Sequence, residues 1–171
     1  SGGNLTNVLI DGTTFFNNRG GSGTTGLESA LAIEALTAGK QSNITITNNS
    51  FDANGKAVLF FNTVGIDIEH NYVTNTLDQY SGTLRFEGNN QNVTIKYNTV
   101  YDNTGPAVAV DAKGVAGDNA NFVVNYNNFY GNSLAYGTHL SVAFDGSVYD
   151  GTPDVGYNYW GSATGPGGDG P

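Results

Sequence analysis

The feature that most constrains this chain is a segment that recurs six times along it, at intervals of 22 to 36 residues. Each copy has alternating apolar residues, then an asparagine or a residue in its place, one further residue and a large apolar residue. The copies are NVLIDGTTFFNN from residue 7, NITITNNSFDAN from 43, GIDIEHNYVTNT from 65, NVTIKYNTVYDN from 92, NFVVNYNNFYGN from 121 and DVGYNYWGS from 154. Such self-similarity is typical of repeat architectures.

A second alternating segment follows each of the first five copies: ALAIE at 30–34, AVLFF at 57–61, TLRFE at 83–87, AVAVD at 107–111 and SVAFD at 141–145. Alternation with period two predicts strands that bury one face. Two short strands per repeat cannot bury their apolar faces alone, but stacked repeats can. We therefore predict an all-β parallel β-helix of about six turns over 7–160. On this division, residues 1–6 are an N-terminal lead-in or a cloning scar. Residues 161–171 form a Gly/Pro-rich closing turn and the start of a linker.

Asparagines recur at one place in successive repeats. Asn tolerates the left-handed backbone of a sharp bend, and stacked amides can hydrogen-bond from turn to turn. We predict an asparagine ladder with Thr13 at its first place, followed by Asn49, Asn71, Asn98, Asn127 and Asn158. Trp160 aligns with the apolar column of Phe15 and Phe51, which predicts a role in core packing.

Composition excludes several functions. The chain has no Cys, so it has neither disulfides nor Cys-ligated metal. It carries 6 Lys and Arg against 15 Asp and Glu, a net charge of −9, which disfavours nucleic-acid binding. No apolar run approaches the length of a membrane span.

These columns resemble right-handed parallel β-helix proteins of the pectate-lyase-like superfamily, and more narrowly the β-helix repeat regions of secreted bacterial surface proteins. The motif NYWGSATGP followed by GGDGP is similar to the closing turn of those regions. The resemblance implies a right-handed solenoid at the cell surface or outside the cell. It also implies a module of a surface, adhesin or filament protein.

Carboxylates recur at the last outward place of the second segment. Glu87, Asp111 and Asp145 belong to consecutive turns, so they are expected about 4.8 Å apart, where a cation would relieve their repulsion. The sequence thus predicts a calcium site at Glu87, Asp111 and Asp145, although a solvated strand edge explains the same charges. Small neighbours predict a flat floor for a polysaccharide or cell-surface glycan, with Thr83, Arg85, Glu87, Ala109 and Asp111 as contacts.

Catalysis is the alternative to a binding module. By resemblance, a polysaccharide lyase would use Arg85 as its base beside calcium-binding acids, and a hydrolase would use clustered acids. The net charge of −9 would repel an acidic substrate, and the long spacers at 19–29 and 112–120 are rich in Gly, Ala and Ser, with few reactive groups. We therefore favour a non-enzymatic module that requires no cofactor and could take calcium.

The ends of the predicted rod lack obvious caps. The strand NVLI at 7–10 follows no amphipathic helix, and an uncovered strand edge invites pairing. The sequence predicts end-to-end association, with copies of itself or with the remainder of a longer chain.

Overall fold

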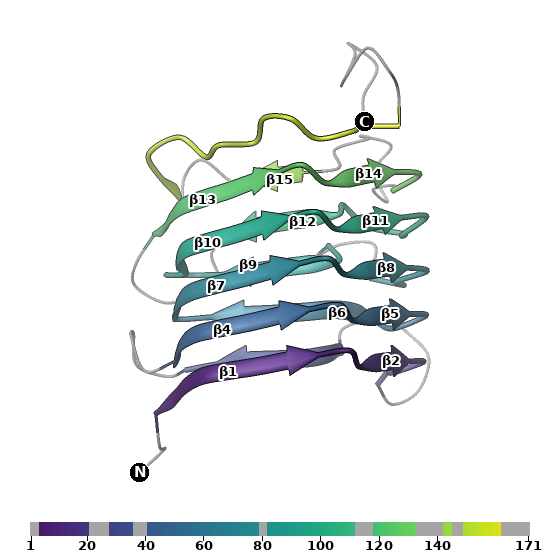
Figure 1. Cartoon of the computed structure of the whole chain (residues 1–171), viewed down its shortest axis with the longest axis horizontal. Helices are drawn as coiled ribbons and strands as arrows, with labels where there is room; N and C mark the ends of the chain where they lie inside the picture. The colour runs from purple at the N-terminus through teal and green to yellow at the C-terminus, as the bar shows by residue number, and fades with distance from the viewer. Residues whose placement is uncertain are drawn as a thin grey trace.

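The computed structural model describes residues 4–20, 28–35, 41–78, 82–111, 118–132, 142–144 and 149–161. These residues form sixteen strands and no helix (Figure 1). The strands lie in three parallel sheets that wrap one core, which confirms the predicted parallel β-helix. The predicted closing segment 161–171 lies outside the described residues, apart from Gly161.

We call the sheets A, B and C. Sheet A holds β1 (Leu5–Asp11), β4 (Gln41–Thr47), β7 (Thr63–Glu69), β10 (Gln91–Lys96), β13 (Asn119–Asn125) and β16 (Tyr149–Asp150). Sheet B holds β2 (Thr14–Phe16), β5 (Ser50–Asp52), β8 (Tyr72–Thr74), β11 (Thr99–Tyr101) and β14 (Asn128–Tyr130). Sheet C holds β3 (Ser29–Glu34), β6 (Lys56–Phe61), β9 (Leu84–Glu87), β12 (Val108–Asp111) and β15 (Val142–Phe144).

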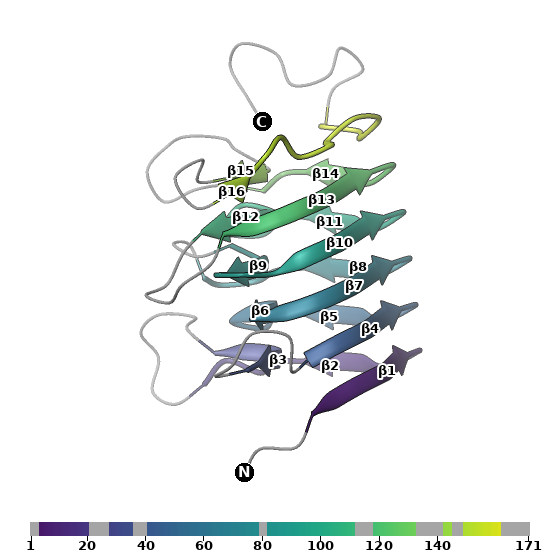
Figure 2. The same ribbon diagram turned by 90° about the vertical axis from the view of Figure 1, so that its left-hand side faces the viewer.

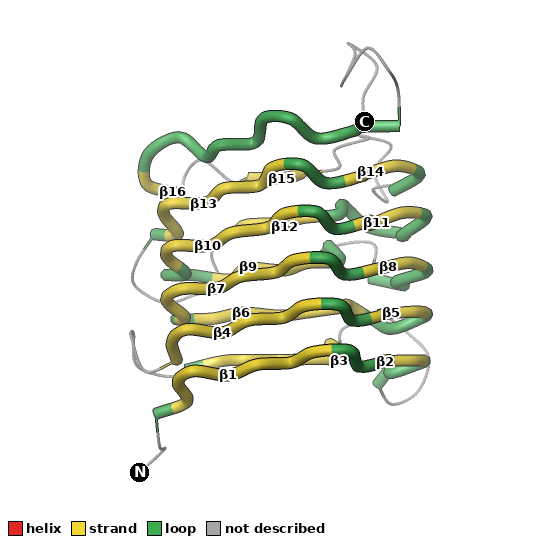
Figure 3. The backbone as a smooth tube through the Cα atoms, viewed as in Figure 1, coloured by secondary structure: helices red, strands yellow, loops and turns green. Residues whose placement is uncertain are grey.

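The chain passes through sheets A, B and C in turn and then begins the next coil, as the tube in Figure 3 shows. Equivalent residues of successive coils pair in register, for example Ile44 with Ile66 and Phe51 with Val73. Figure 2 shows the coils stacked along one axis. The apolar columns fill the space between the sheets with fully buried side chains, among them Ile46, Phe51, Phe60, Ile68, Phe86, Ile95 and Phe129.

Each of the first five coils has three strands, so the expectation of two strands per repeat is wrong. The additional strand is the short one in sheet B, which places a single residue such as Phe51 in the core. One apolar residue between two bends gives no alternation, and the sequence pattern therefore does not separate it from the preceding strand. In addition, β1 begins at Leu5, two residues before the predicted start at Asn7.

The asparagine ladder is present as predicted. The Nδ2 of Asn49, Asn71, Asn98 and Asn127 each donates to the Oδ1 of the next asparagine, at 3.0 Å in every case. Each Oδ1 also accepts the backbone N–H of the preceding coil, beginning with Thr13 on Asn49 at 2.9 Å. The ladder therefore satisfies buried backbone groups at the bend between sheets A and B.

Two further ladders support the other bends. Asn103 donates to Asn132 at 2.8 Å after sheet B. Asn90 donates to Asn119 at 3.0 Å before sheet A, in a column that the sequence analysis did not predict. Trp160 is buried, and its ring centroid lies 5.5 Å from that of Phe129, which confirms its role in core packing.

Candidate functional site

The predicted acidic face lies on sheet C, where Glu87 and Asp111 are partners in register, as expected. The expectation of an open floor around them is wrong, because Thr83, Arg85, Glu87 and Ala109 are all buried. Gly82 packs against this face so closely that a Cβ on it would lie 2.6 Å from the Cβ of Ala109. The outer face of sheet C is therefore covered at these residues.

Arg85 joins the two carboxylates. Its Nε lies 3.4 Å from Glu87 Oε1, and its guanidinium also pairs with Asp111. A second buried ion pair joins Lys56 to Asp78 at 2.9 Å. Arg85 thus supplies positive charge where the sequence analysis expected a calcium ion to relieve repulsion.

The third predicted calcium ligand, Asp145, lies outside the described residues. Within the described ranges, no group of three His, Asp or Glu side chains could hold a metal ion. Calcium binding at Glu87, Asp111 and Asp145 stays a prediction.

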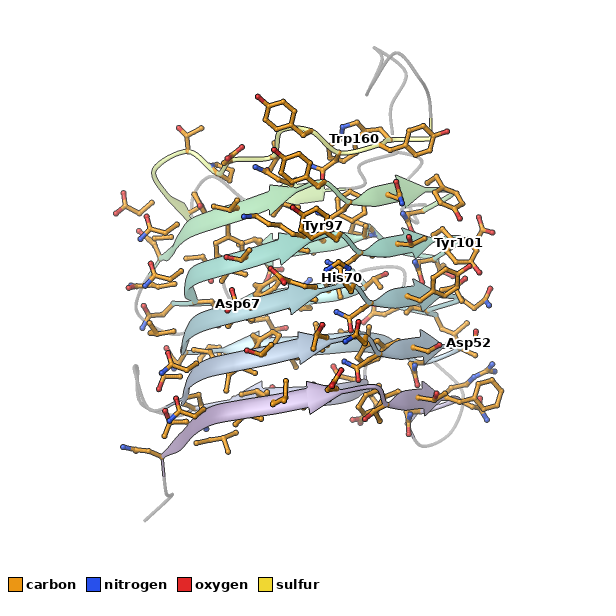
Figure 4. The ribbon with its side chains drawn as sticks, viewed as in Figure 1. Asp52, Asp67, His70, Tyr97, Tyr101 and Trp160 are labelled. Atoms are coloured by element: carbon orange, nitrogen blue, oxygen red, sulfur yellow. The ribbon has the colours of Figure 1, made fainter. Side chains whose placement is uncertain are left out.

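Exposed aromatic rings form a column at the bend between sheets A and B. They lie immediately before the ladder asparagines, one per coil, and their ring centroids are separated by 5.2, 5.6 and 5.4 Å with interplanar angles of 9–14°. Figure 4 shows two of them, His70 and Tyr97, one above the other. We call this set the bend column: His70, Tyr97, Tyr126 and Tyr157.

The bend column occupies left-handed backbone positions. Its φ angles are 55° to 60°, a region that bulky residues rarely adopt. Tyr97 and Tyr126 are about half exposed (51% and 49%), and Tyr157 is 78% exposed. The rings stack on one another along the rod axis. The part of each ring that remains exposed to solvent therefore includes its edge.

A second series of rings lies on the outer face of sheet B and beyond its last strand. Tyr72 contacts Tyr101 with centroids 5.1 Å apart, Tyr101 contacts Tyr130 at 5.1 Å, and Tyr130 contacts Tyr159 at 6.5 Å. We call Tyr72, Tyr101, Tyr130 and Tyr159 the strand series. The bend column and the strand series together form what we call the tyrosine face.

The phenols of the strand series interact with one another. A hydrogen bond with Tyr101 is the main cause that raises the pKa of Tyr72 to about 12, and partial desolvation and the nearby Tyr101 add to it. Partial burial raises the pKa of Tyr130, again with a contribution from Tyr101. Tyr72 and Tyr130 are therefore neutral at physiological pH.

The sequence analysis missed the tyrosine face because it treated each aromatic residue near an asparagine as part of the repeat. A signal was present: the residue before the ladder asparagine is His70, Tyr97, Tyr126 and Tyr157 in four successive copies. An aromatic ring at an outward place in four successive copies is not needed to fill a core.

Comparison with known proteins supports the architecture. Residues 3–165 match the family described as the right handed beta helix region. The chain has no significant match among curated proteins or among solved structures. In the part of the chain that the structure describes, no helix has the length and apolarity needed to cross a membrane. From its repeats, its parallel sheets and this match, the chain belongs to the right-handed β-helix family.

Proposed function

We propose that this chain is a non-catalytic, extracellular β-helix module of a surface, adhesin or filament protein, and that it binds a neutral polysaccharide on the tyrosine face. The observation that carries this proposal is the bend column. Four aromatic rings are exposed, one per coil, at left-handed backbone positions that disfavour them. Asn48 occupies the same place in an earlier coil with φ 55°, so the bend does not require an aromatic ring.

The spacing of the rings favours a linear polymer. Equivalent residues in successive coils are about 4.8 Å apart, close to the length of one pyranose unit. A polysaccharide that runs along the rod axis would therefore meet an equivalent ring at each sugar. Tyrosines offer a large contact area and a hydroxyl group with little conformational entropy to lose.

The charge of the chain favours a neutral sugar. With a net charge of −9 and only six basic residues, the protein repels uronic acids and phosphates before they reach the surface. Asp52 and Asp102 lie beside the strand series and add negative charge there.

The cluster on sheet C supports binding over catalysis. Arg85 is buried and pairs with both Glu87 and Asp111, so a substrate would have to displace two ion pairs before Arg85 could act as a base. The enzymatic alternative, a polysaccharide lyase or hydrolase, predicts unsaturated or shortened products. An assay of product release from polygalacturonate and xylan, with and without calcium, tests it.

Affinity gel electrophoresis tests the proposal directly. We expect hydroxyethylcellulose, xylan or mannan to retard the native chain, and polygalacturonate to leave its mobility unchanged. The variant Tyr97→Asn with Tyr126→Asn removes two rings but keeps a residue that tolerates this backbone. It should lose about 5- to 150-fold in affinity, since each of the two aromatic contacts contributes roughly 0.5–1.5 kcal/mol.

A matched control is Thr94→Asn, which lies on the outer face of sheet A, away from the tyrosine face. It should bind like the native chain. If no neutral polysaccharide retards the native chain, or if the double variant binds as well as the control, the tyrosine face is not a carbohydrate site.

A further inference from the structure

The side chains that oxidants attack most readily are missing from this chain. It contains no Cys and no Met, whereas it contains 10 Tyr and 1 Trp. Sulfur side chains are readily oxidised in exposed positions and would otherwise compete for an oxidant. The indole of Trp160 is buried. A one-electron oxidant that meets the described surface therefore reacts with tyrosine.

The end of the bend column offers the most accessible pair of phenols. Tyr126 and Tyr157 lie on consecutive coils, with ring centroids 5.4 Å apart and an interplanar angle of 9°. Tyr157 is 78% exposed, and among the described residues it stacks on Tyr126 alone. Tyr97, in contrast, has His70 on one side and Tyr126 on the other. Tyr157 can therefore tilt out of the stack with the fast rotations of exposed side chains, whereas Tyr97 is confined.

The strand series is a poorer place for oxidation, because a phenol must lose its proton together with an electron. A hydrogen bond with Tyr101 is the main cause that raises the pKa of Tyr72 to about 12, and desolvation raises the pKa of Tyr130. Every ring contact that defines the strand series involves Tyr72 or Tyr130. Each of its pairs thus includes a phenol that holds its proton more firmly than usual.

The last coil is attached to the stack less regularly than the others. Residues 149–161 contribute the two-residue strand β16 and two isolated bridges, Val123 with Asp154 and Asn128 with Tyr159. The rest of this coil is loop, as Figure 3 shows. The preceding coil has the seven residues of β13 and the three of β14. A covalent bond between Tyr126 and Tyr157 would tie the irregular coil to the regular one, in a chain that has no disulfide.

We propose that Tyr126 and Tyr157 form a dityrosine cross-link when a peroxide-dependent one-electron oxidant, such as a haem peroxidase, acts on this surface. Each phenol loses one electron and its hydroxyl proton, and the two ring radicals join through the carbon atoms next to the hydroxyls. The hydrogen on each of those carbons then moves to the oxygen as a proton, which restores both phenols. One molecule of hydrogen peroxide takes up the two electrons and two protons and becomes two water molecules. The cross-link forms without a polysaccharide, so it is independent of the proposed function.

Oxidation of the dilute native chain by a haem peroxidase with hydrogen peroxide tests the proposal. We expect the monomer to acquire the blue fluorescence of dityrosine and to lose the mass of two hydrogen atoms. Peptide mapping should find Tyr126 joined to Tyr157. The cross-linked monomer should also unfold at a higher urea concentration than the untreated chain, because the link restricts its unfolded state.

Phenylalanine variants provide matched controls. Tyr126→Phe and Tyr157→Phe keep the stacked ring but have no hydroxyl hydrogen to give up, so each should lose nearly all of the monomer fluorescence. Tyr130→Phe removes a phenol of the strand series from the same coil as Tyr126, and its monomer fluorescence should match that of the native chain. A native monomer without dityrosine, cross-links only between molecules, or a mapped bond between other tyrosines would overturn the proposal. Undiminished fluorescence in Tyr157→Phe would overturn it as well.

Discussion

At the scale of single residues, positive φ angles recur at fixed places in each coil. One such place lies inside the strands of sheet A, where Asn7, Asn43, Asn92 and Asn121 have φ of 55–59°. Gly65 takes this place in the third coil with φ 73°. Asn43 donates to Asn7 and Asn121 donates to Asn92, each at 3.1 Å, so this outer asparagine column is interrupted at Gly65.

Gly65→Asn should therefore stabilise the chain. The new amide can accept from Asn92 and donate to Asn43, and the unfolded state loses backbone freedom, so we expect a gain of about 0.5–2 kcal/mol in the free energy of unfolding. The added Cβ would lie 3.1 Å from Asn43 Oδ1, a flexible side-chain atom that can shift. Gly65→Ala is the control, since it adds the same Cβ without an amide and should destabilise. Urea denaturation in which the Ala variant is the more stable of the two would contradict this account.

The phenol of Tyr72 gives a prediction about pH. Its pKa is raised from 10.0 to about 12, so the folded state favours the neutral form. This stabilisation is complete below pH 10 and is lost as the pH rises towards 12. Absorbance titration of tyrosinate should include one tyrosine that ionises near pH 12 while circular dichroism reports an intact fold. Tyr101→Phe removes the hydrogen bond and should bring that ionisation back towards pH 10; an unchanged titration would refute the interaction.

At the scale of elements, the asparagine ladders hold the bends between sheets. Asn98 shows how much one member contributes. Its Nδ2 donates to Ile68 O at 2.8 Å, to Lys96 O at 3.0 Å and to Asn127 Oδ1, while its Oδ1 accepts from the backbone and side chain of Asn71. All these groups lie at the buried bend, so water cannot replace the hydrogen bonds that they lose.

Asn98→Ala should lower the free energy of unfolding by about 1–3 kcal/mol, because it leaves buried donors and acceptors unpaired. The control is Asn128→Ala, an exposed asparagine whose one side-chain hydrogen bond goes to Thr99 Oγ1 at 3.3 Å; it should change stability by no more than about 0.5 kcal/mol. An unchanged urea midpoint for Asn98→Ala would show that the ladder does not stabilise the fold.

The ladder and the long strands could be predicted because both leave periodic marks in the sequence. Asparagine recurs two residues before a buried apolar residue in five of the six copies, and Ile44 with Ile46 or Val93 with Ile95 alternate with polar residues. The burial of Ala109 could not be predicted, because it depends on contacts from outside its strand, such as that of Gly82.

At the scale of the whole molecule, β1, β2 and β3 lie at one end of the stack and each pairs with only one other strand of its sheet. The core is incompletely covered there, because Val8, Ile10, Phe15 and Leu31 are only partly buried. Leu9, which is in register with Thr45 on the outer face of sheet A, is 65% exposed. An edge of this kind can pair with a strand of another molecule.

We expect the isolated chain to associate through this end. Light scattering should show a mass that rises with concentration. Val8→Lys with Leu9→Lys should abolish the rise, because charges on an edge strand oppose pairing. Thr45→Lys with Thr94→Lys places the same charges within sheet A and should leave association intact. A native chain that is monomeric at every concentration would contradict this prediction.

The tyrosine face extends along the same axis as the core, which links the fold to its proposed role. Each coil contributes an equivalent outward place, so a regular polymer meets a regular protein surface. We propose that this match between the repeat of the coils and the repeat of the polysaccharide determines binding.

The most direct test of that claim is the dependence of affinity on the length of the ligand. Calorimetry on the native chain would compare the disaccharide, tetrasaccharide and hexasaccharide of each neutral series with the matched uronic acid oligomers. The account predicts that affinity for one neutral series rises with each added sugar until the ligand spans the four coils of the bend column, and that uronic acid oligomers bind more weakly at every length. An affinity that is the same for the disaccharide and the hexasaccharide, or no binding at any length, would contradict it.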